Sequence, residues 1–152
     1  MFFMMTRTAF GDNVNSIMRS QAIDDLEICV DNSAHTRKLS RMIKLEKHLR
    51  HLSVIHGGDD GLSPLLRALK ENKSVESLEI DFLFGGEKRA LGSLLQEATT
   101  VRSVTLKHPV NLAGFISLMS GLSLNKSLWK FSLNCTMLKE RHCTEIKNAG
   151  QQ

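Results

Sequence analysis

One stretch of twenty residues decides the fold: Gly61-Leu62-Ser63-Pro64-Leu65-Leu66-Arg67-Ala68-Leu69-Lys70-Glu71-Asn72-Lys73-Ser74-Val75-Glu76-Ser77-Leu78-Glu79-Ile80. Its leucines at 62, 65, 66 and 69 have the spacing of one apolar stripe on an α-helix. Ser63 is a suitable cap for that helix, and Pro64 suits its first turn. After Asn72-Lys73-Ser74 apolar and polar residues alternate, which is typical of a strand buried on one face. The stretch therefore predicts one helix, one turn and one strand.

The strand half of this stretch follows the pattern apolar-x-x-apolar-x-apolar, which occurs five times in the chain. The copies are Ile23–Ile28, Leu49–Val54, Val75–Ile80, Val101–Leu106 and Leu128–Leu133. Their central residues are spaced by 26 in the first three steps and by 27 in the last: Leu26, Leu52, Leu78, Val104 and Phe131. A fixed period of this kind is the signature of a repeat architecture, in which each unit packs on the next.

Between the strand copies the apolar residues return to helical spacing. The stripes are Leu91, Leu94, Leu95 and Ala98; Phe115, Leu118, Met119 and Leu122; a poorer one at Thr36, Leu39, Met42 and Ile43; and a remnant at Phe10, Val14, Ile17 and Met18. The helix end Leu65…Leu69…Asn72-Lys73-Ser74 recurs 53 residues later as Leu118…Leu122…Asn125-Lys126-Ser127. The chain is therefore predicted to alternate helix and strand.

The strand motifs and the two matching helix ends resemble the leucine-rich-repeat proteins of the ribonuclease-inhibitor-like class, over roughly Phe10 to Thr136. The resemblance implies an α/β solenoid with about five repeats of 26–27 residues. Such a solenoid is a right-handed horseshoe arc with parallel strands on its concave face and helices on its convex face. The class has Asn, Cys or Thr three residues after the last apolar strand position, where this chain has Asp31, Gly57, Leu83, Pro109 and Thr136. Only Thr136 fits, so we expect irregular loops after the strands.

The length of 152 residues fits a single leucine-rich-repeat domain over 1–152. Within it we expect an N-terminal cap or partial repeat at 1–22, the repeats at 23–136, and a C-terminal cap helix and tail at 137–152. The cap helix is indicated by Met137, Leu138 and Ile146. Because terminal repeats expose core when thinly capped, the chain is expected to be a piece of a longer array or to associate through its ends.

In the arc that the resemblance implies, polar strand positions face a partner. The predicted partner-binding residues of this concave face are Asp25, Glu27, His51, Ser53, Ile55, Ser77, Glu79, Asp81, Phe82, Thr105, Lys107, Lys130 and Ser132. Acidic side chains gather in the first and middle repeats, and lysines toward the C-terminal end. Our hypothesis is that a partner offers basic residues to the acidic side chains and apolar ones to Ile55 and Phe82. The alternative is an ordinary solvated sheet.

The composition argues against several other classes of function. The net charge of +4 comes from scattered bases and not from a nucleic-acid-binding patch. The three cysteines include no CxxC pair, which favours free thiols in a cytoplasmic protein over a disulfide framework or a zinc site. No apolar run approaches the roughly 20 residues that cross a bilayer. We therefore expect neither nucleic acid nor a membrane as a partner.

No motif points to catalysis, to a cofactor or to a metal. The loop at 57–61, Gly-Gly-Asp-Asp-Gly, lacks the Lys-Ser/Thr of a phosphate loop, and no GxSxG or HExxH occurs. His56 and His108 fall two strands apart, about 10 Å, which is too far for one zinc ion. Whether Asp59 and Asp60 bind a cation stays open. The single tryptophan, Trp129, is expected to pack against the C-terminal helix and not to serve as an exposed interface anchor.

The sequence therefore predicts a non-enzymatic interaction module that binds another protein through its concave face, in the cytoplasm. Similarity to Ran GTPase-activating proteins makes a regulator of a small GTPase or nucleotide-binding switch the first alternative. Self-association through the weakly capped ends is the second. The residues do not name the partner.

Overall fold

The computed structural model describes residues 2–5, 23–56, 61–108, 110 and 112–133. These ranges contain the strands β1 Phe2–Met5, β2 Asp25–Val30, β3 His51–His56, β4 Ser77–Ile80, β5 Ser103–Leu106 and β6 Lys130–Leu133. They also contain the helices α2 Ser33–Leu45, α3 Ser63–Glu71, α4 Gly85–Glu97 and α5 Leu112–Leu124. The helix expected around Phe10 to Met18, the Asp59-Asp60 loop and the cap helix expected at 137–152 lie outside the described residues.

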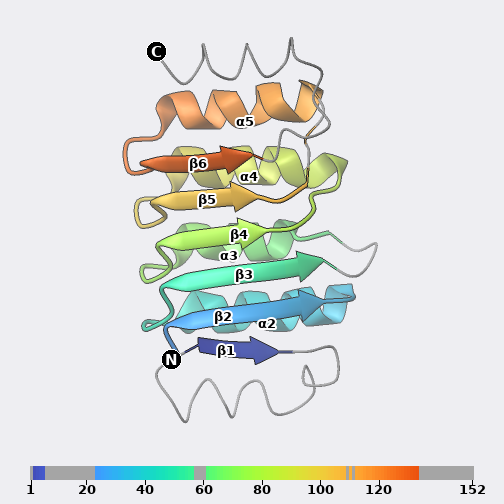
Figure 1. Ribbon diagram of the computed structural model, residues 1–152, viewed down its shortest axis with the longest axis vertical. Helices are drawn as coiled ribbons and strands as arrows, with labels where there is room; N and C mark the ends of the chain where they lie inside the picture. The colour runs from blue at the N-terminus through green and yellow to red at the C-terminus, as the bar shows by residue number, and fades with distance from the viewer. Residues whose placement is uncertain (1, 6–22, 57–60, 109, 111, 134–152) are drawn as a thin grey trace.

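The strands form one parallel sheet in which sequence order is also spatial order, from β1 to β6. Each of β2 to β5 is followed by a helix that returns the chain to the start of the next strand, and α2, α3 and α4 lie on one face of the sheet (Figure 1). The five strand motifs are β2 to β6, so the predicted α/β fold with a parallel sheet is confirmed. No motif predicted β1, which pairs with β2 from Phe2 opposite Asp25 to Met5 opposite Ile28.

Residues that are 26 positions apart in the sequence are paired on neighbouring strands of the sheet. Leu26 lies opposite Leu52, Leu52 opposite Leu78, and Leu78 opposite Val104. These side chains are buried in a single core together with leucines in and directly before α3, namely Leu62, Leu65, Leu66 and Leu69. Burying a side chain of this size contributes about 1.5–3 kcal/mol relative to leaving it exposed. Equivalent positions of successive repeats therefore stack on one another, and each such stack forms one row of the core.

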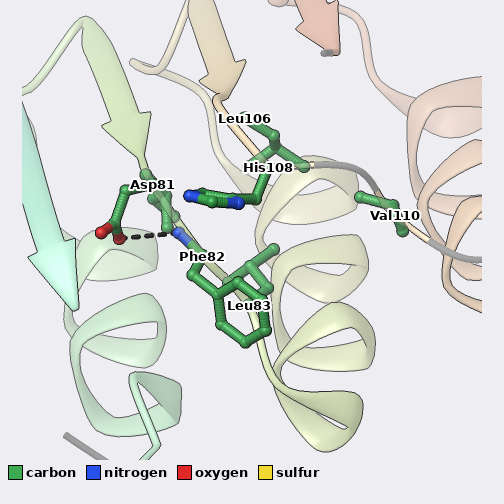
Figure 2. A pocket seen from close by; sticks show the side chains of 7 residues that line it. Asp81, Phe82, Leu83, Leu106, His108 and Val110 are labelled. Atoms are coloured by element: carbon green, nitrogen blue, oxygen red, sulfur yellow. Dashed lines mark hydrogen bonds between the residues drawn. The ribbon is translucent and has the colours of Figure 1, made fainter. Parts of the chain in front are cut away.

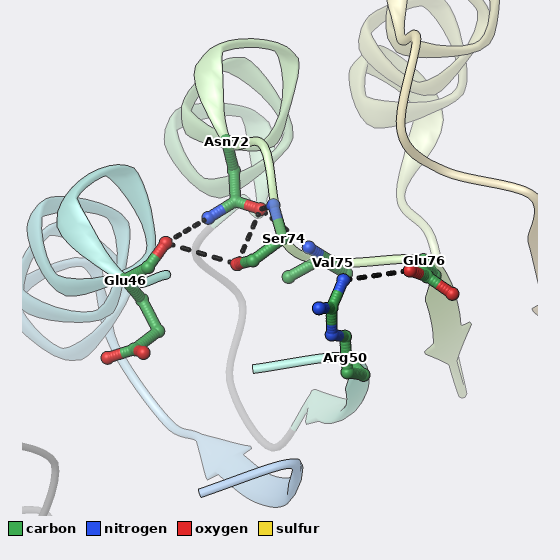
Figure 3. A network of polar contacts seen from close by, with 6 residues as sticks. All are labelled: Glu46, Arg50, Asn72, Ser74, Val75 and Glu76. Carbon is green, nitrogen blue, oxygen red and sulfur yellow. Dashed lines mark hydrogen bonds and ion pairs between the residues drawn. The ribbon is translucent and has the colours of Figure 1, made fainter. Parts of the chain in front are cut away.

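Asn72 lies in the turn between α3 and β4 and links that turn to the repeat before it (Figure 3). Its side-chain amide donates to the backbone oxygens of Ile43, at 2.6 Å, and Glu46, at 3.0 Å. Its side-chain oxygen accepts from the backbone N–H groups of Ser74, at 2.8 Å, and Val75, at 2.7 Å. The Ser74 hydroxyl adds a donor to the Glu46 oxygen at 3.1 Å. One side chain therefore satisfies the end of α2 and the start of β4 together.

The same arrangement recurs 53 residues later, as the matching helix ends suggest. The Asn125 amide donates to the backbone oxygen of Leu95, and its side-chain oxygen accepts from the N–H groups of Ser127 and Leu128. The Ser127 hydroxyl donates to the Ala98 oxygen at 2.8 Å. We call the two sets the asparagine staples. They show that Asn-Lys-Ser does more than end a helix, because it joins neighbouring repeats.

We expect Asn72→Ala to lower the free energy of unfolding by about 2–4 kcal/mol, because it leaves buried backbone donors and acceptors unsatisfied. Urea denaturation measures this. The matched control is Lys73→Ala on the exposed neighbouring residue, which we expect to change stability by no more than about 0.5 kcal/mol. Equal stability of the two variants would show that water replaces the staple at no cost.

A buried carboxylate, Glu87, holds the loop before α4. Its two oxygens accept from the backbone N–H groups of Leu62 and Phe84, the second at 2.5 Å. The prediction that Ser63 caps α3 is wrong: Leu62 is the N-cap residue and Ser63 is the first residue of the helix. At this helix start Glu87, from the next repeat, accepts from the N–H of the N-cap residue Leu62. Pro64 does lie in the first turn of α3, as predicted.

Helices α4 and α5 approach each other more closely than side chains would allow. A Cβ added at Gly121 would overlap the carbonyl group of Gly92 and lie 2.8 Å from its carbon. A Cβ added at Gly92 would lie 2.8 Å from the carbonyl oxygen of Ser117. The two glycines are therefore required by the close packing of these helix backbones, although glycine disfavours a helix by roughly 0.5–1 kcal/mol relative to alanine.

We expect Gly121→Ala to destabilise the protein by about 1–3 kcal/mol, because α4 and α5 must move apart. The control is Gly86→Ala in the partner helix α4, where an added Cβ meets nothing within 4 Å. That variant should be neutral or gain up to about 1 kcal/mol from better helix propensity. Thermal unfolding followed by circular dichroism compares them, and a Gly121→Ala protein as stable as Gly86→Ala would contradict the close approach.

Candidate functional site: the outer face of the sheet

The predicted partner-binding residues fall mainly on one face of the sheet. In β2, β4 and β5 buried residues alternate with half-buried ones, and the buried set packs on the helices. The half-buried set therefore lies on the opposite side, which we call the outer face. It carries Asp25, Glu27, His51, Ser53, Ile55, Ser77, Glu79, Thr105, Lys130 and Ser132. Asp81, Phe82 and Lys107 follow directly after β4 and β5.

Two rows cross this face from strand to strand. The first row is Asp25, His51, Ser77, Ser103 and Lys130, and the second is Glu27, Ser53, Glu79, Thr105 and Ser132. The structure therefore places the predicted residues side by side, in the columns that the 26-residue period implies. Neighbouring members of a row lie about 4.8 Å apart, the spacing between strands.

A shallow depression occupies the N-terminal half of these rows. It has a volume of about 200 Å³ and is lined by Asp25, Leu26, Glu27, His51, Leu52, Ser53, Ser77 and Glu79. Three of these eight residues are acidic, and His51 Nε2 lies 4.0 Å from an Asp25 carboxylate oxygen. The depression suits a long side chain from another molecule better than an enclosed small ligand, because it is open along the sheet.

Glu79 is the centre of the polar contacts on the outer face. Lys107 Nζ lies 2.6 Å from Glu79 Oε1, and the Ser53 hydroxyl donates to the same oxygen at 3.2 Å. The hydrogen bond to Glu79 raises the pKa of the Lys107 ammonium, with further support from the charges of Glu79, Glu27 and Asp81, although partial burial opposes it. The negative charges of three carboxylates, those of Glu79, Glu27 and Asp81, therefore act together on the Lys107 ammonium.

Because the folded-state pKa of Lys107 is raised, the pair stabilises the fold fully below the ordinary lysine pKa, about 10.4, and its contribution is lost as pH rises through the raised value. We expect Glu79→Gln to lower the pKa of Lys107, since the first cause of the shift is removed. Side-chain NMR titration of the lysines measures this, with Lys130 as the internal control. An unchanged Lys107 pKa would contradict the contact.

A second group of residues lies where β4 and β5 end, at the C-terminal ends of the strands (Figure 2). An Asp81 carboxylate oxygen accepts from the backbone N–H groups of His56, at 2.8 Å, and Phe82, at 2.6 Å. Phe82 lies beyond the end of β4, whereas Ile55 points to the outer face. The two apolar residues expected to meet a partner therefore lie on different parts of the surface, and Phe82 packs with Phe84 and His108. The spacing Phe82-x-Phe84 was the signal that could have revealed this group.

The single tryptophan lies on the surface. Trp129 is 81% exposed, contrary to the prediction that it is packed and not exposed. The C-terminal helix named as its packing partner lies outside the described residues. Within the described ranges no group of three or more His, Cys, Asp or Glu side chains is placed to hold a metal ion. In the same part of the chain, every helix is too short or too polar to cross a bilayer.

No protein-family model and no curated protein sequence matches this chain. A comparison of folds does find relatives among solved structures. Leiomodin-1 actin-binding site 2 has the same fold. The likeness has a TM-score of 0.70 and covers 95% of this chain and 88% of that fragment, at 14% sequence identity. At that identity the likeness shows the fold alone, which is leucine-rich-repeat-like. It supports the repeat architecture, and it leaves the GTPase-regulator and self-association hypotheses as predictions.

Proposed function

We propose that this chain is a non-enzymatic protein-binding module that holds a segment of a partner protein on the outer face of its sheet. The observation that carries the proposal is the acidic depression around Glu27 and Glu79, set in rows of polar side chains that the helices leave uncovered. The fold relative is itself described as an actin-binding site, which is consistent with a protein as the partner.

We further propose that the stack belongs to the ribonuclease-inhibitor-like class of leucine-rich repeats, with the outer face as the concave wall of a horseshoe. The helix-and-strand unit of 26–27 residues and the parallel register support this assignment. We place its action in the cytoplasm, where the Cys29 side chain would stay a reduced thiol.

The partner segment should carry positive charge where it meets the depression. Asp25, Glu27 and Glu79 line that depression, and Lys107 neutralises one of them. A lysine or arginine side chain would gain charge-assisted hydrogen bonds with the remaining carboxylates. Actin is the first protein to test as a partner, on the strength of the fold relative alone.

The double variant Glu27→Lys/Glu79→Lys should weaken binding at least about tenfold, because like charges then face the partner. These positions are cleaner than Asp81, whose carboxylate also holds two backbone N–H groups. Ligands for the measurement are actin, in monomeric and filamentous form, and peptides selected on the immobilised full chain from a random display library. Affinity is measured by fluorescence anisotropy or co-sedimentation.

The control is Glu71→Lys, the same type of substitution at one exposed position at the end of α3, on the helix side of the sheet. It should leave affinity within about twofold, since a surface pair contributes little. If selected ligands bind the double variant as tightly as the wild type, the outer face is not the binding site.

A further inference from the structure

Four aromatic rings from three consecutive repeats meet at the C-terminal ends of β3, β4 and β5. In order they are His56, Phe84, Phe82 and His108. The centroids of His56 and Phe84 lie 5.0 Å apart, those of Phe82 and Phe84 4.8 Å, and those of Phe82 and His108 5.6 Å. All three pairs meet edge to face, the arrangement that aromatic rings favour. We call these four residues the aromatic ledge.

The ledge is exposed although it is built from large apolar rings. Phe82 is 39% and Phe84 37% exposed to solvent. The cavity beneath Phe82 and His108 measures only about 10 Å³, lined also by Leu83 and Val110 (Figure 2). That volume corresponds to about one water molecule, so the ledge offers a surface and not a ligand pocket.

The backbone that presents these rings is held at every step. Asp81 accepts from the N–H groups of His56 and Phe82, and Glu87 accepts from that of Phe84. The N–H of His108 donates to the backbone oxygen of Asp81 at 2.9 Å. The backbone that carries the rings is therefore fixed before any partner arrives, and binding costs little further loss of backbone freedom.

Negative charge adjoins the ledge on its outer-face side. Asp81 and Glu79 precede Phe82 in the chain, and together with Glu27 their charges act on Lys107. Within the described residues no ion pair is formed by Asp81 or Glu27. The ledge therefore borders a surface that attracts cations and repels carboxylates.

We infer that the aromatic ledge is the anchor for one kind of partner: a protein segment in which an apolar side chain stands close to a lysine or arginine. The apolar side chain lies on Phe82 and Phe84, and the basic one reaches Glu27 on the outer face, beside the Glu79 carboxylate that Lys107 pairs. Phe82 follows Glu79 by three positions, which is about 10 Å along an extended chain and within reach of neighbouring side chains of one segment. The inference rests on the proposed function and specifies the partner that the outer face selects.

The test uses the peptides selected on the full chain from the random library. They should be enriched in sequences that place Leu, Met, Ile or Phe within a few residues of Lys or Arg. Phe82→Ala should weaken their binding about tenfold, the loss typical of an aromatic anchor, and Phe82→Leu should restore most of it. Trp129→Ala, which removes the most exposed aromatic side chain among the described residues, should leave affinity within about twofold.

The outcomes separate this inference from the proposal on which it rests. Peptides that respond to Glu27→Lys/Glu79→Lys but bind Phe82→Ala normally leave the outer face as the site and overturn the ledge as its anchor. Selected peptides that lack basic residues or carry acidic ones overturn the inferred partner. Binding that responds to neither change, or no selected peptide at all, contradicts the proposed function itself. Urea denaturation of Phe82→Ala confirms that a loss of affinity is not a loss of fold.

Discussion

The asparagine staple is the contact on which the stacking of repeats depends. A solenoid leaves polar backbone groups exposed toward the next unit wherever a helix ends and a strand begins, and buried groups of this kind must be paired. Asn72 pairs four of them across two repeats, and Asn125 pairs three further along. The leucines bring the repeats together, but they are non-directional; the staples fix how one repeat is placed on the next.

The staples occur in alternate repeats, so the true structural unit spans two. In the turn after α2 the place of the asparagine is taken by Glu46, whose carboxylate accepts from the N–H groups of Lys47 and His48 within its own turn. That turn satisfies itself and offers its backbone oxygen to Asn72 of the following repeat. The 53-residue recurrence in the sequence therefore corresponds to two kinds of turn that alternate. In one kind an asparagine side chain donates hydrogen bonds, and in the other the backbone oxygens accept them.

Different contacts therefore hold the two ends of the strands. Where a helix leads into the next strand, the asparagine staples join neighbouring repeats. At the strand-to-helix edge, where the polar residues of the leucine-rich-repeat class are mostly missing, Asp81 and Glu87 take over the backbone groups. Carboxylates of this kind hold a loop rigid while leaving its side chains to point outward, which is how Phe82 and Phe84 come to be ordered and exposed at once.

The sequence by itself determined the architecture, because a period of 26 residues dictates strand register once the strands are parallel. Leu26, Leu52 and Leu78 had to lie side by side, and so did Glu27, Ser53 and Glu79 on the other face. Only the tertiary structure decided which distant groups pair: that Glu87 reaches Leu62, that Gly121 meets Gly92, and that Phe84 joins Phe82 and two histidines. The reason is that periodicity specifies which face a side chain occupies, whereas its partners in the loops depend on how each turn is folded against its neighbour.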